Sequence, residues 1–176
     1  MSEPVESPSA ARHKALAAEH NSISLAVVTV SDSRTPETDT NFHYLRDAVL
    51  STGFGICAYH LIKDEPEQVI AVLQWLASDG KAQVVFFNGG TGISRRDTTF
   101  DALNRCLEKT LPGFGEIFRM LSYQQIGSPA MFSRATAGVY RGMVIVSTPG
   151  SPAAVRLAWE KLILPEIQHL VWEVNR

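Results

Sequence analysis

Three glycines within four positions mark the segment Asn88–Asp97, NGGTGISRRD, as the part of this sequence best suited to chemistry. Glycine tolerates positive φ and lets a ligand approach the main chain closely. Backbone N–H groups in such a turn can converge on a phosphate, and the hydroxyl of Thr91 can add a donor. The spacing matches neither the Rossmann fingerprint nor the P-loop. It indicates either a phosphate cradle of another kind or a tight turn that simply needs glycine. Arg95 and Arg96 are interpreted as solvated side chains.

Two aspartates, Asp64 and Asp97, follow predicted strands and could share one Mg²⁺ ion, for which carboxylate oxygen is a preferred ligand. Each also has a structural interpretation. Asp97 could cap a helix that begins near Thr98, where Asp101 would complete a capping pair. Asp64 could cap the helix that follows it, around 69–76, because Glu67 stands three residues later as in a capping box and Pro66 suits the first turn. The residue pattern by itself favours capping in both cases.

Two other polar loops follow predicted strands, Ser31–Arg34 and Thr148–Ser151. Ligands of open α/β sheets bind beyond the carboxyl ends of the strands, which is where all these loops belong. Ser151 is a good N-cap and Pro152 a good first helical residue. An ordinary helix start is the simpler interpretation of that second loop, and an anion-accepting helix N-terminus is the functional one.

The elements that must position these loops follow from the hydrophobic pattern. Near-continuous apolar runs predict buried strands, and apolar residues at helical spacing predict amphipathic helices between them. We predict strands at 24–30, 56–62, 82–87 and 142–146, a strand or irregular segment at 132–140, and helices at 41–50, around 69–76, at 98–107, around 114–121 and from about 153, with Pro165 ending or kinking the last. Strands that alternate with helices predict a parallel sheet covered on both faces.

The chain has 176 residues, of which 45% are hydrophobic and 19% charged, values typical of one globular domain. We expect a flexible tail over 1–20, with a short helix at 11–20, and a single domain over 21–176. A net charge of -2 gives no footprint for nucleic acid or an anionic membrane. No apolar run suits a membrane span or a signal peptide, so we expect a cytoplasmic protein. Cys57 and Cys106 are interpreted as buried thiols, and the scattered histidines suggest no zinc site.

Four segments taken together carry a resemblance: NGGTGISRRDTTFDAL, LPGFGEIFRMLSYQQIG, SRATAGVYRGMVIVSTPGSPAAV and AWEKLILPEI. In this order they resemble the molybdenum-cofactor biosynthesis family typified by MoaB and Mog. The resemblance runs from about Ser24 to Ile167. The segments LSYQQIG and AWEKL look closer to the MoaB branch. The family commonly has threonine before GGTG and proline four residues after the arginine of its R-D-x-T motif, where this chain has Asn88 and Phe100.

The resemblance implies a three-layer α/β/α domain of the molybdopterin-binding type, with a mostly parallel central sheet, assembled as a homotrimer or homohexamer. In active relatives the terminal phosphate of molybdopterin attacks the α-phosphate of ATP in the presence of Mg²⁺, and pyrophosphate leaves. The function implied is therefore Mg²⁺-dependent adenylylation of molybdopterin by ATP. The alternative is a non-catalytic protein of the same pathway that binds molybdopterin or a nucleotide. A third hypothesis is an oligomeric scaffold whose loops are mere turns.

The same resemblance implies the site residues. Asp64 and Asp97 match the two aspartates that the family needs for catalysis and for holding the metal. The positions that match ligand contacts are Ser31, Asp32 and Ser33, Gly89, Gly90, Thr91 and Gly92, Pro149, Gly150 and Ser151, and, around the pterin pocket, Glu116, Ser122, Ser133 and Arg134.

Overall fold

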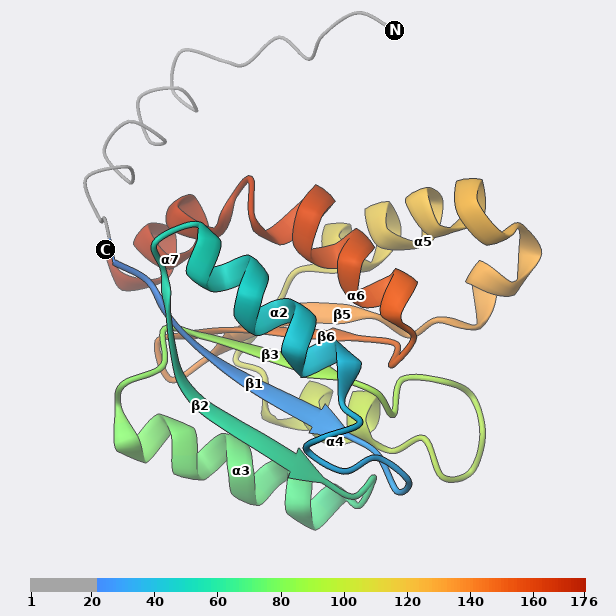
Figure 1. Ribbon diagram of the computed structural model, residues 1–176, viewed down its shortest axis with the longest axis horizontal. Coiled ribbons are helices and arrows are strands. Elements are labelled where there is room, and N and C mark those ends of the chain that lie inside the picture. Colours follow the sequence, from blue (N-terminus) through green and yellow to red (C-terminus); the bar gives the residue numbers. More distant parts are fainter. Residues whose placement is uncertain (1–21) are drawn as a thin grey trace, which may run out of the picture.

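The computed structural model describes residues 22–176, which form a sheet with helices on both sides (Figure 1). The tail expected over 1–20, with its short helix, lies outside the described residues. The strands are β1 (Ser24–Val30), β2 (Gly55–Ile62), β3 (Val84–Asn88), β4 (Lys109–Thr110), β5 (Thr136–Tyr140) and β6 (Met143–Thr148). Their order across the sheet is β2-β1-β3-β6-β5-β4. The first four strands of that order are parallel, and β5 and β4 are antiparallel to their neighbours.

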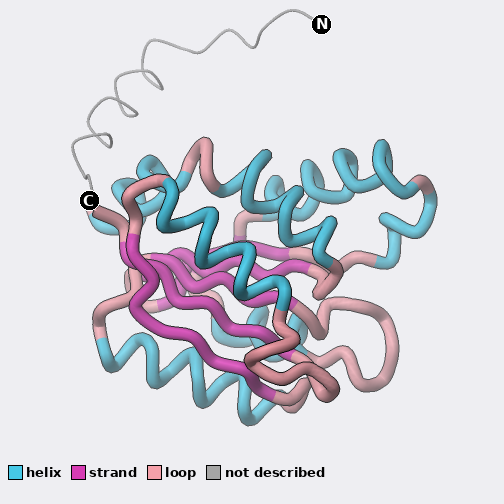
Figure 2. The backbone as a smooth tube through the Cα atoms, in the orientation of Figure 1, coloured by secondary structure: helices cyan, strands magenta, loops and turns pink. Residues whose placement is uncertain are grey.

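Helices cover the two faces of the sheet unequally (Figure 2). One face carries α2 (Thr40–Ser51), α5 (Pro112–Ile126), α6 (Pro152–Ala158) and α7 (Ile167–Asn175), and the other carries α3 (Pro66–Asp79) and α4 (Thr99–Cys106). Alternate residues of one strand serve the two cores: Leu25 and Val27 pack with the first group, and Ala26 and Val28 with the second. This period of two is what a strand buried on both faces requires. The predicted three-layer α/β/α fold with a mostly parallel sheet is confirmed.

The second half of the chain contains the irregular elements. Residues 128–132 form a 3₁₀ helix, η1 (Ser128–Phe132), and β5 then pairs with β6 through a two-residue turn. Arg141 and Gly142 in that turn both have positive φ, as a hairpin with the twist of the flanking strands needs. The last helix is interrupted by a π-helical turn, η2 (Trp159–Ile163), just before Pro165, which agrees with the predicted break. The two-residue strand β4 was not predicted, because so short an edge has no readable periodicity.

Several side chains expected in the core differ in their burial. In the helix predicted around 114–121, Phe118 is buried, and Phe114 and Leu121 are partly buried and pack against the core. Cys57 and Cys106, expected to be buried, are half-buried free thiols. No helix of the described region has the length and apolar character that would let it cross a membrane.

Candidate functional site

The glycine loop (Asn88–Asp97) and the elbow between β6 and α6 (Pro149–Ser151) meet at the carboxyl ends of the parallel strands. The N–H of Gly89 donates to the carbonyl of Thr148 at 2.9 Å, which continues the pairing of β3 with β6 beyond the strands. The packing is close, since a Cβ placed on Gly150 would lie 3.3 Å from Cα of Gly89. Two of the predicted ligand loops are thus in direct backbone contact.

The loop itself requires glycine at two successive positions. Gly89 and Gly90 have φ of 110° and 65°, a region that other residues adopt at a cost. A Cβ on Gly89 would collide with the carbonyl of Val30, and a Cβ on Gly90 would collide with the side chains of Asp64 and Thr99. The loop backbone therefore presses directly against one of the two predicted catalytic aspartates.

Asp64 is a cap, but of a different helix from the one predicted. Its Oδ1 accepts from the N–H and the hydroxyl of Thr98, at 3.1 and 2.9 Å, and from the Thr99 hydroxyl at 3.1 Å. These donors belong to the start of α4, whereas α3 begins after Glu65 without any side-chain cap. The predicted capping box with Glu67 is wrong. Sequence spacing could not reveal this cap because its partners lie 34 and 35 residues away.

Asp97 does not cap α4, contrary to the interpretation that the residue pattern favoured. Its Oδ2 accepts from the N–H of Ser94 at 2.8 Å and so closes a turn inside the loop. The N-cap of α4 is Thr98, which makes no side-chain capping bond. Asp101, expected to pair with Thr98, instead forms an ion pair with Arg134 at 2.9 Å. Asp97 also lies against Gly92, where a Cβ would be 2.8 Å from Oδ2.

The two aspartates therefore flank the glycine segment, with Asp64 beside Gly90 and Asp97 beside Gly92. Oδ2 of Asp64 accepts no hydrogen bond from the described residues. No cluster of three or more His, Cys, Asp or Glu side chains within residues 22–176 could form a complete metal cage. Two carboxylates with an open side suit Mg²⁺, which usually keeps several waters and binds through one or two carboxylates plus phosphate oxygens. The donor set fits such an ion.

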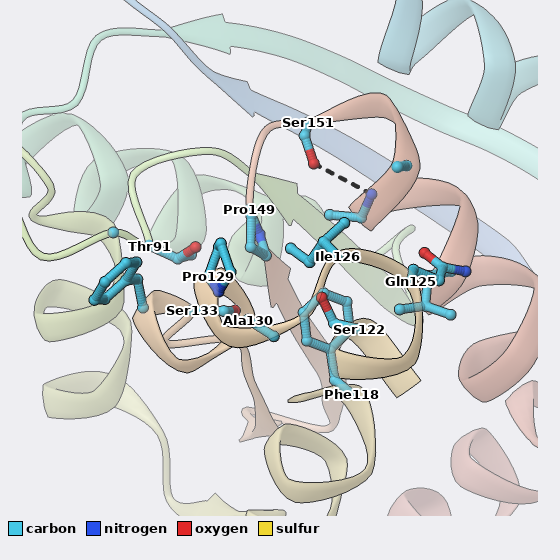
Figure 3. A pocket seen from close by; sticks show the side chains of 15 residues that line it. Thr91, Phe118, Ser122, Gln125, Ile126, Pro129, Ala130, Ser133, Pro149 and Ser151 are labelled. Carbon is cyan, nitrogen blue, oxygen red and sulfur yellow. Dashed lines mark hydrogen bonds between the residues drawn. The ribbon is translucent and has the colours of Figure 1, made fainter. Parts of the chain in front are cut away.

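A cavity of about 240 Å³ lies next to this loop (Figure 3). Six of the predicted ligand residues line it: Thr91, Gly92, Ser122, Ser133, Pro149 and Ser151. The hydroxyl of Thr91 is buried and has no hydrogen-bond partner among the described residues. Buried polar groups are normally paired, so this hydroxyl is well placed to bond to a ligand. The oxygen of Ser151, in contrast, accepts from the N–H of Ala154 at 3.3 Å, as the ordinary helix start predicts.

The apolar lining of the cavity was missed by sequence reasoning. It comes from Phe118 and Ile126 of α5, from Ala130 and Phe132 of η1, and from Leu157 of α6. Phe118 follows Gly92 by 26 residues and the other side chains lie farther along the chain, so only the tertiary packing brings them to the loop. From the sequence pattern alone, these apolar residues look like ordinary core residues. Apolar walls with a few polar groups are typical of small-molecule sites.

Glu116 and Arg134 line a second cavity of about 470 Å³, which shares Ser133 with the first. Arg134 fixes the glycine loop from outside: its side chain donates to the carbonyl oxygens of Gly92 at 2.8 Å and Asp97 at 2.9 Å. Its guanidinium also stacks 4.7 Å from the ring centre of Phe100. Phe100, which replaces the family's usual proline, thus helps to orient Arg134, and α4 still begins at Thr99.

The Ser31–Ser33 segment contacts the glycine loop through an ion pair between Asp32 and Arg96. The hydroxyl of Ser31 accepts from the backbone N–H groups of Ser33 and Arg34, at 3.3 and 3.2 Å, and shapes the turn. In that ion pair the side chain of Arg96 is 80% exposed. Arg96 is solvated as expected, but it also connects the two loops.

A buried polar network beneath these loops was not predicted. Asp39 is fully buried, caps α2 through the N–H of Phe42, and pairs with Arg34 at 3.3 Å. The hydroxyl of Tyr59 donates to the same carboxylate at 2.9 Å. Burial, followed by this hydrogen bond, raises the pKa of Tyr59, so its phenol remains a donor at physiological pH. Only the N-cap position of Asp39 before an apolar stripe could have been read from the sequence.

The comparisons with known proteins agree with this architecture. Residues 26–169 match the family described as a probable molybdopterin binding domain. The molybdenum cofactor biosynthesis protein B of Bacillus subtilis is 47% identical over 151 residues, which cover 85% of this chain and 89% of that protein. A crystal structure of a molybdenum cofactor biosynthesis protein B is 42% identical, with a TM-score of 0.85 and coverage of 88% of this chain and 97% of that one.

A more distant structure extends the similarity. The molybdopterin biosynthesis enzyme MoaB from Thermus thermophilus is 31% identical, with a TM-score of 0.77, and the match covers 87% of this chain and 96% of that one. The fold and the family match thus place the chain in the class of molybdopterin-binding domains. Within that class, the chain belongs to the MoaB family of molybdenum cofactor biosynthesis proteins.

Proposed function

We propose that this protein adenylylates molybdopterin in the synthesis of the molybdenum cofactor, using ATP and Mg²⁺. The observation that carries the proposal is the placement of Asp64 and Asp97 against Gly90 and Gly92, next to a cavity lined by Thr91, whose hydroxyl is buried and has no partner in the described residues. A metal-placing pair of carboxylates beside a glycine turn suits chemistry that depends on positioning and charge neutralisation.

In the proposed reaction the cavity holds molybdopterin between the walls formed by Phe118, Ile126 and Pro149. The Gly89–Gly92 backbone and Thr91 hold its terminal phosphate. An oxygen of that phosphate attacks the α-phosphorus of ATP, the bond from that phosphorus to the β-phosphate oxygen breaks, and pyrophosphate leaves. Asp64 and Asp97 would hold Mg²⁺, which neutralises the charge on the phosphates. No side chain needs to form a covalent intermediate.

The direct test is to incubate the full chain with molybdopterin, ATP and MgCl₂ and to measure adenylylated molybdopterin and pyrophosphate. The proposal predicts both products in equal amounts and none after chelation with EDTA. Molybdopterin binding without product would establish the alternative, a non-catalytic binding protein of the same pathway. Neither binding nor product would contradict both and leave only the scaffold hypothesis.

We also propose that the protein is a cytoplasmic homotrimer or homohexamer. The support is a row of exposed apolar side chains on α5, Ile117, Met120 and Tyr123, which are 45%, 55% and 63% exposed and share one helix face. Light scattering after size-exclusion chromatography should give three or six times 19.3 kDa. Met120→Lys should lower that mass, and Leu50→Lys on α2, at an equally exposed position of 55%, should not.

A further inference from the structure

The carbonyl oxygen of Gly150, in the elbow between β6 and α6, is held by two side chains from the region that follows β1. The guanidinium of Arg34 donates to it at 2.8 Å, and the amide of Asn41 donates to it at 2.9 Å. The adjacent residues Pro149 and Ser151 line the first cavity, whereas the two donors do not. The position of this cavity wall therefore depends on side chains outside the cavity.

Asn41 also connects the elbow to the strand that leads into the glycine loop. The same amide nitrogen donates to Oδ1 of Asn88 at 2.8 Å, and the amide of Asn88 donates to the hydroxyl of Thr29 at 2.9 Å. All three side chains are at most 1% exposed. A continuous buried chain of hydrogen bonds thus runs from β1 through the end of β3 to Gly150, and Asn88 is the residue directly before Gly89.

The amide of Asn41 is a poor source of stability, because its Oδ1 is buried without a hydrogen-bond partner in the described part of the chain. A buried unpaired oxygen costs free energy, and two apolar residues of similar shape could replace the Asn41–Asn88 pair with little loss. Turning the amide would place its oxygen against the carbonyl of Gly150. Gly150 therefore fixes the orientation of the Asn41 amide. Holding the elbow in place explains an amide at this position better than a contribution to stability does.

The second donor, Arg34, is also held in place by other side chains. Arg34 is held by the buried carboxylate of Asp39, which also accepts the hydroxyl of Tyr59. The elbow is thus fixed from one side by a network rooted in α2 and β2. On its other side the elbow packs against the glycine loop, since a Cβ placed on Gly150 would lie 3.3 Å from Cα of Gly89. A shift of the elbow would change the cavity between these two walls.

We propose that Asn41 is a positioning residue for ligand binding: its amide holds the Gly150 carbonyl and sets the spacing between the elbow and the glycine loop. The identity of the ligand, molybdopterin, rests on the proposed function. Asn41 touches neither the cavity nor the two aspartates, so its effect should appear in ligand affinity and in the order of the elbow.

Asn41→Asp is the sharpest variant, because it preserves shape and removes the donor. The Asn88 amide can turn to donate to the new carboxylate and accept from Thr29, with loss of its longer bond to the Val28 carbonyl, so the link to β3 survives while the link to Gly150 is lost. We expect the dissociation constant for molybdopterin to rise tenfold or more. Hydrogen exchange in the peptide spanning 147–158 should become faster. Asn41→Ala provides a second variant in case the carboxylate disturbs folding.

Gln83→Ala is the matched control. It removes the bond that Gln83 accepts from the N–H of Ser24 at 3.1 Å, at the opposite end of the sheet, and should leave affinity and elbow exchange unchanged. Binding within twofold of wild type in folded Asn41 variants, or unchanged exchange in the elbow, would overturn the inference. If the wild-type chain binds no molybdopterin, the proposed function fails, and the exchange measurement still decides the role of Asn41.

Discussion

At the scale of single residues, the two aspartates of the site differ in what they contribute to the folded chain. Asp64 accepts three hydrogen bonds from the start of α4, whereas Asp97 accepts one from its own loop. Hydrogen bonds to a charged group are stronger than neutral ones. The two side chains can share a catalytic role and still have unequal effects on stability.

Asp97→Asn should lower the rate of adenylyl transfer by roughly a hundredfold or more, while molybdopterin binding survives. The amide oxygen of asparagine can still accept from the N–H of Ser94, so the melting temperature should stay near that of wild type.

Asp64→Ala should abolish transfer and also lower the free energy of unfolding by about 2–3 kcal/mol, because three donors at the start of α4 lose their acceptor. Activity assays and urea unfolding of the two variants measure both effects. Full activity of Asp97→Asn would refute the metal-placing role.

Gly90 and Gly80 offer a matched test of the crowding around the loop. Their φ angles are nearly equal, 65° and 68°, but a Cβ on Gly80 meets nothing within 4 Å. Gly80→Ala should therefore cost about 1 kcal/mol of stability from backbone strain alone. Gly90→Ala should cost more and weaken ligand binding, since Asp64 and Thr99 must move. Equal losses in thermal or urea unfolding would show that the loop has room for a side chain.

The candidate residues could be found from the sequence, but not their partners. The glycines, the two aspartates and Thr91 are recognisable by type and spacing. The cap of α4 by Asp64 and the support of the loop by Arg134 depend on contacts across 34 and 42 residues. Local rules assign caps to the nearest polar residue and so chose Asp97. Distant residues become neighbours only when the sheet brings the strand ends together.

At the scale of elements, the periodic segments were predicted correctly, whereas the form of three short irregular ones was not. The strand β1 and the helix α2 agree with the predicted ranges within one residue. The strand β4, the 3₁₀ helix η1 and the π-helical turn η2 are two to five residues long, and their form is set by their neighbours. The antiparallel attachment of β5 follows from the Arg141–Gly142 turn, a local signal that could have been read.

The contact between β2 and α3 should make stability depend on pH. His60 of β2 packs edge-on against Trp75 of α3, 5.0 Å between ring centres, and burial lowers the pKa of His60. The unfolded chain therefore binds a proton more readily than the folded one, and the stability from this neutral histidine is lost as pH falls below about 6.5. The melting temperature should drop between pH 7 and 5.5. His60→Phe keeps a ring against Trp75 and should reduce that drop; identical pH curves for the two proteins would contradict the assignment.

At the scale of the whole molecule, the sheet brings together loops that are far apart in the sequence. The glycine loop follows β3, the elbow follows β6, and Asp64 follows β2, yet all three lie at one edge because their strands are parallel. Binding of a ligand there should stabilise the entire fold, since these loops are anchored in both cores. Ligand binding and global unfolding are therefore linked measurements.

Molybdopterin at a hundred times its dissociation constant should stabilise the native state by about 2.7 kcal/mol, which raises the melting temperature of a chain of this size by roughly 5–10 °C. Thr91→Val separates this effect from intrinsic stability. The Thr91 hydroxyl has no partner in the described fold, so valine should leave the melting temperature of the free protein equal or higher. The shift caused by molybdopterin should shrink, because the ligand loses a buried hydrogen-bond donor. No shift in the wild-type protein would favour the scaffold hypothesis, and an undiminished shift in Thr91→Val would place the phosphate elsewhere on the loop.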